Sequence, residues 1–300
     1  MKYDLIIVGM GTSGISAAIY AKNSGLNVLL LERDTPGGLL NKINIINNYP
    51  GYTEVSGSDL SFSLFQSVLQ LKIPYKKAEV VDIEVKDGVK LIKTDVGEFE
   101  SSFVLLATGR SSKTLGLKNE DKFYGKGIST CALCDGNLYE GKDICVVGGG
   151  NSALEEALYL SNIVRKVYLV HRRDAFRGEQ TFIEKIKEKE NIEILYNSQV
   201  TGIIEKEEKI VGVLLNGKEK LEVSALFLYI GFTPGCVFVK NLGITDSAGY
   251  IEVQSNYETK VTGIYAVGDC IKKEVYQLIT AANDGVMAAL DIIKRIEKED

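Results

Sequence analysis

The residues with the clearest capacity for chemistry stand in the middle of the chain, in the run Cys131-Ala132-Leu133-Cys134-Asp135-Gly136. Two cysteines separated by two residues are close enough to form a disulfide across a single turn. They can cycle between disulfide and dithiol without rearrangement of the fold. Asp135 follows directly and is a candidate to give or take the proton that this cycle requires. The motif predicts a redox-active pair, but the same spacing also occurs in half of a zinc site.

Cysteine usage bears on the zinc alternative. The chain has five cysteines, an odd number for a disulfide framework. In a reducing cytosol a Cys-x-x-Cys pair is more often catalytic or metal-binding than structural. A zinc site needs further cysteine or histidine ligands, yet the only histidine is His171, and Cys145 and Cys236 fall in apolar strands or turns. We therefore expect no metal, and the polar, glycine-flanked setting also disfavours two inert core cysteines.

Composition places the chain among globular α/β proteins. Its 300 residues are 45% hydrophobic with a net charge of −5, and its 30 glycines against 4 prolines suit a fold with many tight strand-to-helix turns. No basic patch suggests binding to nucleic acid. The apolar run Leu5–Val8 is too short for a signal peptide or a membrane span, so we expect a cytoplasmic location without membrane attachment.

The first residues have the pattern of a dinucleotide-binding unit. An apolar run predicts a buried strand at Tyr3–Val8, and helical periodicity follows at Ile15–Lys22. Between them stands Gly9-Met10-Gly11-Thr12-Ser13-Gly14, and a second strand, Asn27–Leu31, ends at Glu32. Strand, glycine-rich turn, helix, strand and a terminal acid about 20 residues on make up the dinucleotide fingerprint.

The glycines and the acid have separate physical roles in this prediction. Gly9 permits the tight turn, Gly11 lets a pyrophosphate approach the backbone, and Gly14 lets the helix pack against the strand. Amides at the helix N-terminus hold the phosphates. Glu32 is placed to accept hydrogen bonds from a ribose diol and would repel a 2′-phosphate. This unit is therefore predicted to bind FAD or NAD rather than NADP.

A loop and a β-rich stretch follow the first fingerprint. The loop runs from Gly37-Gly38-Leu39-Leu40 to Asn47-Asn48-Tyr49-Pro50-Gly51, and loops of this length in a compact domain are usually functional. An amphipathic helix is predicted at Gly57–Leu71. Strand signals occur at Ala78–Val85, Val89–Thr94 and Gly97–Ser101, and a return strand at Ser102–Leu106 ends in Ala107-Thr108-Gly109.

The same order of elements then repeats. A strand at Asp143–Val147 opens into Gly148-Gly149-Gly150-Asn151-Ser152-Ala153. Helix Leu154–Asn162, strand Lys166–Val170, hairpin-like strands from Gln199 to Val223 with Asn216-Gly217 as a turn, and a return strand Ala225–Tyr229 before Ile230-Gly231 complete the second unit. Two dinucleotide-binding units of similar plan are the simplest account of this repeat.

The second unit differs at the end of its second strand. Where the first unit has Glu32, this one runs His171-Arg172-Arg173-Asp174-Ala175-Phe176-Arg177. Three arginines in place of a ribose-binding acid supply the charge expected for a 2′-phosphate, so we predict that this unit binds NADP. A solvated basic turn is the alternative. For His171, packing and a contact to the adenosine both remain open.

The C-terminal part has two further signals. Strand signals occur at Gly249–Val253 and directly before Gly268-Asp269. Asp269, at the end of the second of these strands, is suited to accept hydrogen bonds from the hydroxyls of a flavin ribityl chain. A bland strand terminus is the alternative. Gln277–Lys294 is predicted to be a helix whose first turn directs backbone amides at the pyrimidine edge of a flavin.

Together these motifs resemble the low-molecular-weight bacterial thioredoxin reductases of the pyridine nucleotide-disulfide oxidoreductase family, over nearly the whole chain. The matching segments are Gly9–Gly14, Gly37-Gly38, Asn48-Tyr49-Pro50-Gly51, Ala107-Thr108-Gly109, Cys131–Gly136, Gly148–Ala153, His171–Arg177 and Gly268-Asp269. The resemblance implies an α/β fold of two Rossmann-like domains of the three-layer ββα type, one inserted into the other. An FAD domain would cover 1–112 and 242–300, and an NADPH domain 113–241 would carry the cysteines. Two short strands near Ser111–Leu117 and Gly235–Leu242 would join the domains, and the protein would be a homodimer.

The resemblance also implies the chemistry and the binding residues. Electrons would pass from NADPH to FAD, then to the Cys131–Cys134 disulfide and to oxidised thioredoxin. Cys134 would face the flavin, Cys131 would attack thioredoxin, and Asp135 would be the acid and base. FAD would contact Gly9, Gly11, Thr12, Ser13, Gly14, Glu32, Arg33, Gly37, Gly38, Leu39, Leu40, Asn48, Ala78, Ala107, Thr108, Gly109, Gly268, Asp269, Gln277, Leu278 and Ile279. NADPH would contact Gly148, Gly150, Asn151, Ser152, Ala153, His171, Arg172, Arg173, Arg177, Ile230 and Gly231.

Several positions depart from the pattern of these reductases. Leu39 stands where glutamine is usual, Tyr276 where arginine is usual, and Asn47, Asn151 and Asn283-Asp284 also differ. Relatives that draw electrons from ferredoxin would be expected to lose the second glycine fingerprint and the arginines, which this chain keeps. A ferredoxin-dependent enzyme or one with a glutaredoxin-like or peroxidase-linked partner is the alternative. A flavin-binding sensor or a ferredoxin–NADP reductase would not need the cysteine pair.

Overall fold

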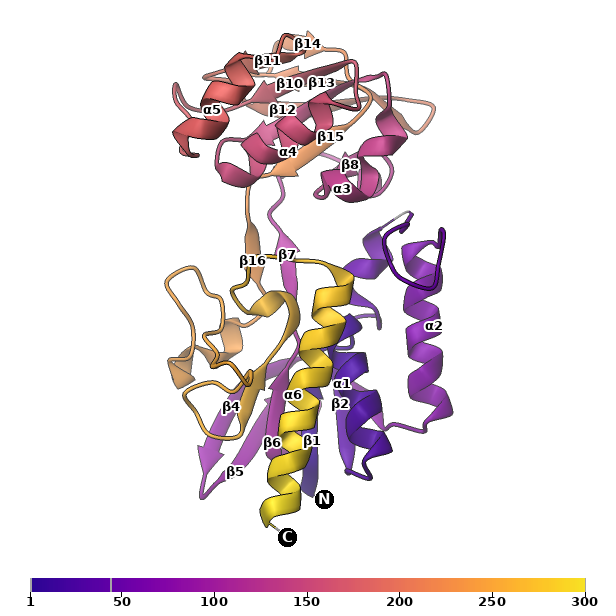
Figure 1. Cartoon of the computed structure of the whole chain (residues 1–300), viewed down its shortest axis with the longest axis vertical. Helices are drawn as coiled ribbons and strands as arrows, with labels where there is room; N and C mark the ends of the chain where they lie inside the picture. Colours follow the sequence, from indigo (N-terminus) through magenta and orange to yellow (C-terminus); the bar gives the residue numbers. More distant parts are fainter. Residues whose placement is uncertain (1, 44, 300) are drawn as a thin grey trace. The chain divides into compact units, whose positions relative to one another are not determined.

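A computed structural model describes residues 2–43 and 45–299 of the chain. The chain forms two compact units, each with its own sheet and core (Figure 1). The first contains residues 1–42, 49–111 and 233–300, and the second contains residues 43–48 and 112–232. The second unit is thus inserted between two pieces of the first. Which nucleotide each unit holds remains a prediction.

The first unit is built from both ends of the chain. Its strands are β1 (Lys2–Val8), β2 (Val28–Glu32), β3 (Tyr75–Lys77), β4 (Val80–Lys86), β5 (Val89–Thr94), β6 (Gly97–Leu106) and β17 (Ile264–Ala266). Its helices are α1 (Thr12–Asn23), α2 (Gly57–Gln70) and α6 (Leu278–Glu299), with 3₁₀ helices η1 (Gly38–Lys42), η4 (Val237–Leu242) and η5 (Gly268–Cys270).

These strands form one seven-stranded sheet in the order β3-β2-β1-β6-β5-β4, with β17 also paired to β6. The strands β3, β2, β1, β6 and β17 are mutually parallel, and β4 and β5 extend the sheet antiparallel. Along β1, Leu5 and Ile7 enter one core and Ile6 and Val8 enter the other. A strand buried on both faces reads as a continuous apolar run, which explains the uninterrupted hydrophobic pattern of β1.

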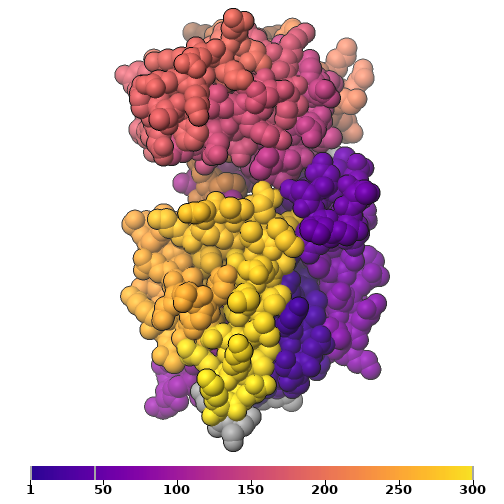
Figure 2. Space-filling model, in the orientation of Figure 1, coloured from indigo at the N-terminus to yellow at the C-terminus, as the bar shows by residue number. Residues whose placement is uncertain are grey.

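Helices α1 and α6 cover the same face of this sheet and approach each other closely. Small side chains make the approach possible, because Ala17, Ala18 and Ala288 are fully buried in the shared core. At Gly285 a Cβ would lie 2.1 Å from the carbonyl oxygen of Ser13, so any side chain there would force the helices apart. Figure 2 shows the α6 segment, in yellow, on the surface of this unit.

The second unit is built around a parallel sheet, which has five strands where the sheet of the first unit has seven. Its strands are β8 (Ile128–Ser129), β9 (Asp143–Gly148), β10 (Lys166–Val170), β11 (Ile192–Leu195), β12 (Val200–Lys206), β13 (Lys209–Leu215), β14 (Glu219–Leu221) and β15 (Leu226–Tyr229). Its helices are α3 (Ala132–Asp135), α4 (Asn151–Ser161) and α5 (Gln180–Lys187), with 3₁₀ helices η2 (Glu120–Phe123) and η3 (Gly136–Tyr139).

This unit has three layers. The parallel sheet β11-β10-β9-β15-β8 lies in the centre. One face of this sheet, with Ile144 and Val146, packs against α4 and α5. The opposite face, with Cys145 and Val147, packs against the antiparallel sheet β12-β13-β14. The second unit thus consists of a layer of helices, a parallel sheet and an antiparallel sheet. This arrangement confirms the predicted three-layer α/β fold.

The chain passes between the units along two short strands, β7 (Arg110–Ser112) and β16 (Phe232–Pro234), which pair with each other. The expected positions of these strands were partly wrong, because Val237–Leu242 is a 3₁₀ helix. The strands expected at Gly97–Ser101 and Ser102–Leu106 are one strand, β6. At Gly249–Val253 only Ile251 makes an isolated bridge. Short segments of this kind are specified by their partners rather than by their own sequence.

Candidate active site

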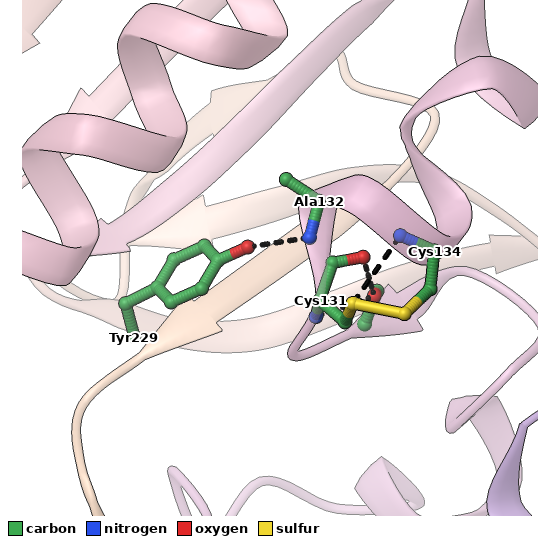
Figure 3. The surroundings of a disulfide bond; sticks show 5 residues. Cys131, Ala132, Cys134 and Tyr229 are labelled. Carbon is green, nitrogen blue, oxygen red and sulfur yellow. Dashed lines mark hydrogen bonds between the residues drawn. A yellow bond between two sulfur atoms is a disulfide. The ribbon is translucent and has the colours of Figure 1, made fainter. Parts of the chain in front are cut away.

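The cysteine pair forms a disulfide in the second unit, with 5.3 Å between the two Cα atoms. Cys131 precedes the single turn of α3, and its Sγ accepts a hydrogen bond from the backbone N–H of Cys134 at 3.2 Å (Figure 3). The predicted pairing of the two cysteines is therefore present. A backbone donor at the sulfur of Cys131 is also suited to stabilise a thiolate when the bond is reduced.

Two side chains outside the motif hold its backbone. The Ser129 hydroxyl donates to the carbonyl of Cys131 at 3.2 Å and accepts from the Cys131 N–H at 3.1 Å. The Tyr229 hydroxyl accepts from the N–H of Ala132 at 2.8 Å (Figure 3). Neither residue was predicted from the sequence. Tyr229 ends β15 beside Gly148 of β9, and a polar residue at the carboxyl end of a parallel strand was the signal that could have found it.

Asp135 directly follows Cys134 and has only 9% of its surface exposed. Burial raises the pKa of Asp135, and a hydrogen bond with Ser129 opposes this shift. Its Oδ1 atom is buried and accepts no hydrogen bond within the described residues. Burial and the nearby charge of Asp135 also raise the pKa of Tyr139 to about 12. A carboxyl with a raised pKa and a free acceptor atom, one residue after Cys134, is suited to exchange protons with a thiol.

The first glycine-rich turn fits the phosphates of a dinucleotide. A Cβ at Gly9 would lie 2.4 Å from the carbonyl oxygen of Ala107, and one at Gly14 would lie 2.0 Å from that of Gly9. Around Gly11 no atom lies within 4 Å of such a Cβ. Close packing at Gly9 and Gly14 and open space at Gly11 are the pattern expected when a ligand approaches the middle glycine.

Glu32 lies at the end of β2 and holds this turn. Its Oε2 accepts the Met10 N–H at 2.7 Å, and its Oε1 accepts the Asp34 N–H at 3.0 Å. The carboxylate therefore lies against the glycine-rich loop, and its contact with a ribose stays a prediction. The adjacent Arg33 is exposed and pairs with Asp34 and Glu79.

Several other residues predicted for FAD lie beside the same turn. Thr12 and Ser13 begin α1 and are buried. A Cβ at Gly268 would lie 2.6 Å from the Ser13 Oγ, and one at Gly37 would lie 1.8 Å from the Ser61 Oγ. The remaining residues predicted for FAD also belong to the first unit. They are Gly38, Leu39 and Leu40 in η1, Ala78 after β3, Ala107, Thr108 and Gly109 after β6, and Gln277, Leu278 and Ile279 at the start of α6. Asn48 differs, since the segment 43–48 groups with the second unit.

Asp269 lies in a cluster of charged groups that the sequence did not predict. Its Oδ2 lies 3.5 Å from Arg110 Nε and its Oδ1 lies 3.7 Å from Lys273 Nζ. Lys273 also pairs with the buried Asp284 at 2.8 Å. The Arg110 guanidinium carbon lies 3.7 Å from the centre of the Tyr276 ring. Tyr276 replaces an expected arginine, and the stacked Arg110 keeps a cation beside that position.

The second glycine-rich turn repeats the packing of the first. A Cβ at Gly148 would lie 2.7 Å from the carbonyl oxygen of Tyr229, and no atom lies within 4 Å of one at Gly150. Ala153 of α4 is fully buried and stands at the position in this motif that Gly14 has in the first unit. Asn151 ties this turn to α5, because its side chain accepts from the Glu179 N–H and donates to the Glu179 carboxylate, both at 2.7 Å.

His171 packs beneath this turn. It is only 5% exposed, its Nε2 lies 3.0 Å from the Ala175 carbonyl oxygen, and its ring centre lies 5.3 Å from that of Phe176. A Cβ at Gly149 would lie 2.3 Å from the imidazole ring. Burial lowers the pKa of His171. The structure thus supports the packing role for His171 that the sequence left open.

The three arginines lie at the end of β10 with their side chains exposed. The N–H of Arg177 donates to the Gly149 carbonyl at 2.8 Å, which holds this segment against the glycine-rich turn. Within residues 2–43 and 45–299, no carboxylate pairs with Arg172, Arg173 or Arg177. Basic side chains without protein partners next to a nucleotide-type turn are suited to bind a phosphate.

The remaining cysteines are isolated in the cores. Cys145, Cys236 and Cys270 are free and buried. Burial raises the pKa of the Cys145 and Cys236 thiols to about 12 and that of Cys270 to about 11, so all three are poor nucleophiles at neutral pH. Reactive thiol chemistry therefore falls to Cys131 and Cys134. In the described part of the chain, every helix is too short or too polar to cross a membrane.

Comparisons with known proteins give one consistent result. A family described as pyridine nucleotide-disulphide oxidoreductase matches residues 3–285. The chain is 38% identical to the thioredoxin reductase of Mycoplasma genitalium, over 97% of this chain and 94% of that protein. It is 36% identical to that of Bacillus subtilis, over 99% and 95%. The crystal structure of thioredoxin reductase from Streptococcus pyogenes matches with a TM-score of 0.94 and 34% identity, over 99% of both chains.

Proposed function

Because this chain belongs to the pyridine nucleotide-disulphide oxidoreductase family, we propose that it is a thioredoxin-disulfide reductase that uses FAD and NADPH. The observation that carries the proposal is the Cys131–Cys134 disulfide in a unit of Rossmann type, within a chain similar to thioredoxin reductases over nearly its whole length. From the resemblance to this family we also propose that the protein is a homodimer and is located in the cytoplasm.

Thiol–disulfide exchange follows from the chemistry of the pair. Two electrons and two protons convert the Cys131–Cys134 disulfide to two thiols. The thiolate of Cys131 then attacks one sulfur of the thioredoxin disulfide, and the other thioredoxin sulfur leaves as a thiolate. Cys134 attacks Cys131 in the resulting mixed disulfide, which restores the bond in the enzyme and releases reduced thioredoxin. The assignment of Cys131 as the attacking thiol rests on the resemblance.

The two nucleotide-type turns divide the cofactor sites between the units. In the first unit the open space at Gly11, the buried Ser13 and the Glu32 carboxylate are proposed to hold FAD. In the second, Gly150 and the unpaired arginines are proposed to hold NADPH through its 2′-phosphate. When bound, these nucleotides supply two electrons to the disulfide, delivered as hydride from NADPH by way of the flavin.

An anaerobic titration tests this function. Purified protein loaded with FAD is mixed with NADPH, NADH or reduced ferredoxin, and bleaching of the flavin absorbance is followed before oxidised thioredoxin is added. We expect rapid bleaching by NADPH and recovery of the colour on addition of thioredoxin. Bleaching by reduced ferredoxin alone would show a different electron donor. Absence of recovery with thioredoxin would point to a different partner.

Asp135→Asn is expected to slow thioredoxin turnover about 100-fold, the lower end of what general acid–base catalysis contributes. Burial raises the pKa of Asp135, so the carboxyl stays protonated to a higher pH than an exposed aspartate. Its capacity to donate a proton is present below that pKa and lost as the pH rises through it. In the wild type, turnover should therefore fall as the pH rises through the pKa of Asp135. In the Asp135→Asn variant this fall should be absent. Asp121→Asn, an exposed change in the same unit, is the control.

A further inference from the structure

Tyr229 connects the redox motif to the neighbouring strand. It ends β15, and its hydroxyl accepts the Ala132 N–H at 2.8 Å, so it holds the peptide bond that directly follows Cys131 (Figure 3). This contact lies within the second unit. The proposed roles of Asp135 and of the two cysteines do not include this hydrogen bond. We therefore consider what Tyr229 contributes to the cysteine pair.

Glu156 of α4 approaches the same hydroxyl group. The Glu156 carboxyl lies close enough to the Tyr229 hydroxyl for the two groups to interact electrostatically. Burial raises the pKa of Tyr229 well above its usual range, so the phenol keeps its proton and can donate it to the carboxylate. The phenol accepts from the Ala132 amide, and donation of its proton to Glu156 completes the proposed chain of two hydrogen bonds. Hydrogen bonds in such a chain polarise and strengthen one another.

We propose that Tyr229 and Glu156 are positioning residues for the Cys131–Cys134 couple, with the phenol fixing the peptide after Cys131 and Glu156 fixing the phenol. The proposal rests on the redox function proposed above. In the oxidised protein the disulfide itself holds the two cysteines together. In the reduced protein only non-covalent contacts keep the Cys134 N–H near the Cys131 sulfur, where it stabilises a thiolate. The anchor therefore stabilises the reduced, reactive form.

The anchor is expected to depend on pH. Burial, and next the charge of Glu155, raise the pKa of Glu156 to about 7. Above this pH the ionised carboxylate accepts a charge-assisted hydrogen bond from Tyr229, which is stronger than a neutral one. Below it the bond is weaker. The groups that face this pair are Glu155 on the same helix and Asp135 of α3, whose charge acts on the phenol.

A purely electrostatic role for Glu156 would have the opposite sign. A negative charge near the motif disfavours a thiolate, so removal of that charge would make Cys131 more reactive. Under the positioning role, removal of the charge loosens the anchor and makes Cys131 less reactive. The direction of the change in Cys131 reactivity therefore separates the two roles.

Alkylation of the chemically reduced, FAD-loaded protein tests the proposal. Iodoacetamide labelling of Cys131 is followed by mass spectrometry of its peptide from pH 6 to pH 9, without NADPH or thioredoxin. We expect Tyr229→Phe to slow labelling at pH 7 about five-fold, the effect of one hydrogen bond. Glu156→Gln should slow it about two-fold at pH 8 and leave it unchanged at pH 6, since a charge-assisted bond is lost only above pH 7. The equilibrium with glutathione should shift about five-fold toward the disulfide in Tyr229→Phe.

The controls lie in the same unit. Tyr168→Phe on β10 and the exposed Glu219→Gln on β14 should leave the labelling profile unchanged. In Tyr229→Phe the further change Glu156→Gln should have no added effect, because the chain is already broken. Faster labelling in Glu156→Gln above pH 7, or a wild-type profile in Tyr229→Phe, overturns the proposal. If Tyr229→Phe does not fold, the direction of the Glu156→Gln effect alone decides. Because the assay omits NADPH and thioredoxin, failure of the proposed function leaves the result readable.

Discussion

Cys134→Ser is expected to lower thioredoxin turnover at least about 1,000-fold, as is usual when a covalent catalytic group is removed. Reduction of the flavin by NADPH should continue at the normal rate, because the two glycine-rich turns proposed to bind the nucleotides do not contain the cysteines. A serine cannot form the disulfide with Cys131, so the electrons have no route to thioredoxin. Stopped-flow measurement of flavin bleaching beside a steady-state thioredoxin assay checks both halves of this expectation.

The control for this variant is a cysteine of the same unit that is outside the motif. Cys145 is fully buried in the core beside β10 and β15, and Cys145→Ala removes a thiol without touching the redox pair. It should keep turnover within about three-fold of the wild type, since core truncation of this size acts on stability rather than chemistry. Near-normal turnover in Cys134→Ser would contradict the disulfide relay.

The double variant Arg172→Ala/Arg173→Ala is expected to weaken NADPH binding about 100-fold or more, since each hydrogen bond to a charged group is worth about 1.5–3 kcal/mol. NADH has no 2′-phosphate for these side chains to contact, so its affinity should change less than about three-fold. Titration of both nucleotides against the oxidised protein, followed by calorimetry, measures the ratio. The expected loss is larger at low salt, where screening is weak.

A matched control removes the same charge elsewhere in the second unit. Lys218 lies in the turn between β13 and β14, Lys220 lies in β14, and both are exposed. Lys218→Ala/Lys220→Ala should bind NADPH and NADH as the wild type does. An equal loss of both nucleotides in the arginine variant would show that the arginines support the fold of the turn, and it would rule out a specific role with the 2′-phosphate.

The glycine positions show how far sequence reasoning reached. The separate roles predicted for Gly9, Gly11 and Gly14 follow from backbone sterics. The close packing at Gly9 and Gly14 agrees with their roles, and the approach of a pyrophosphate to Gly11 stays a prediction. Such roles are readable because a tight turn and a close helix leave few alternatives to glycine. The paired cysteines were readable for the same reason, since their spacing places both in one turn.

Other features depended on partners that lie far away along the chain. The contact between Tyr229 and Ala132 joins residues from β15 and α3, and no local pattern indicates it. Helix α5 and strands β7 and β16 are short and gain their structure from neighbours. The stacking of Arg110 on Tyr276 likewise appears only in three dimensions. Predictions from periodicity therefore succeeded where the apolar pattern was clear, including the short strands β10 and β15, and failed at Gly249–Val253.

The division of the chain has a consequence for its synthesis. The second unit is nearly continuous in sequence, whereas the first needs β17 and α6 from the C-terminal end to complete its sheet and its core with α1. Domains generally fold as units while the ribosome is still at work. We therefore expect the part with the redox cysteines to fold on the ribosome before the other unit. Until α6 is synthesised, the apolar faces of β6 and α1 stay uncovered, so nascent chains that stop before Leu278 should depend most on chaperones.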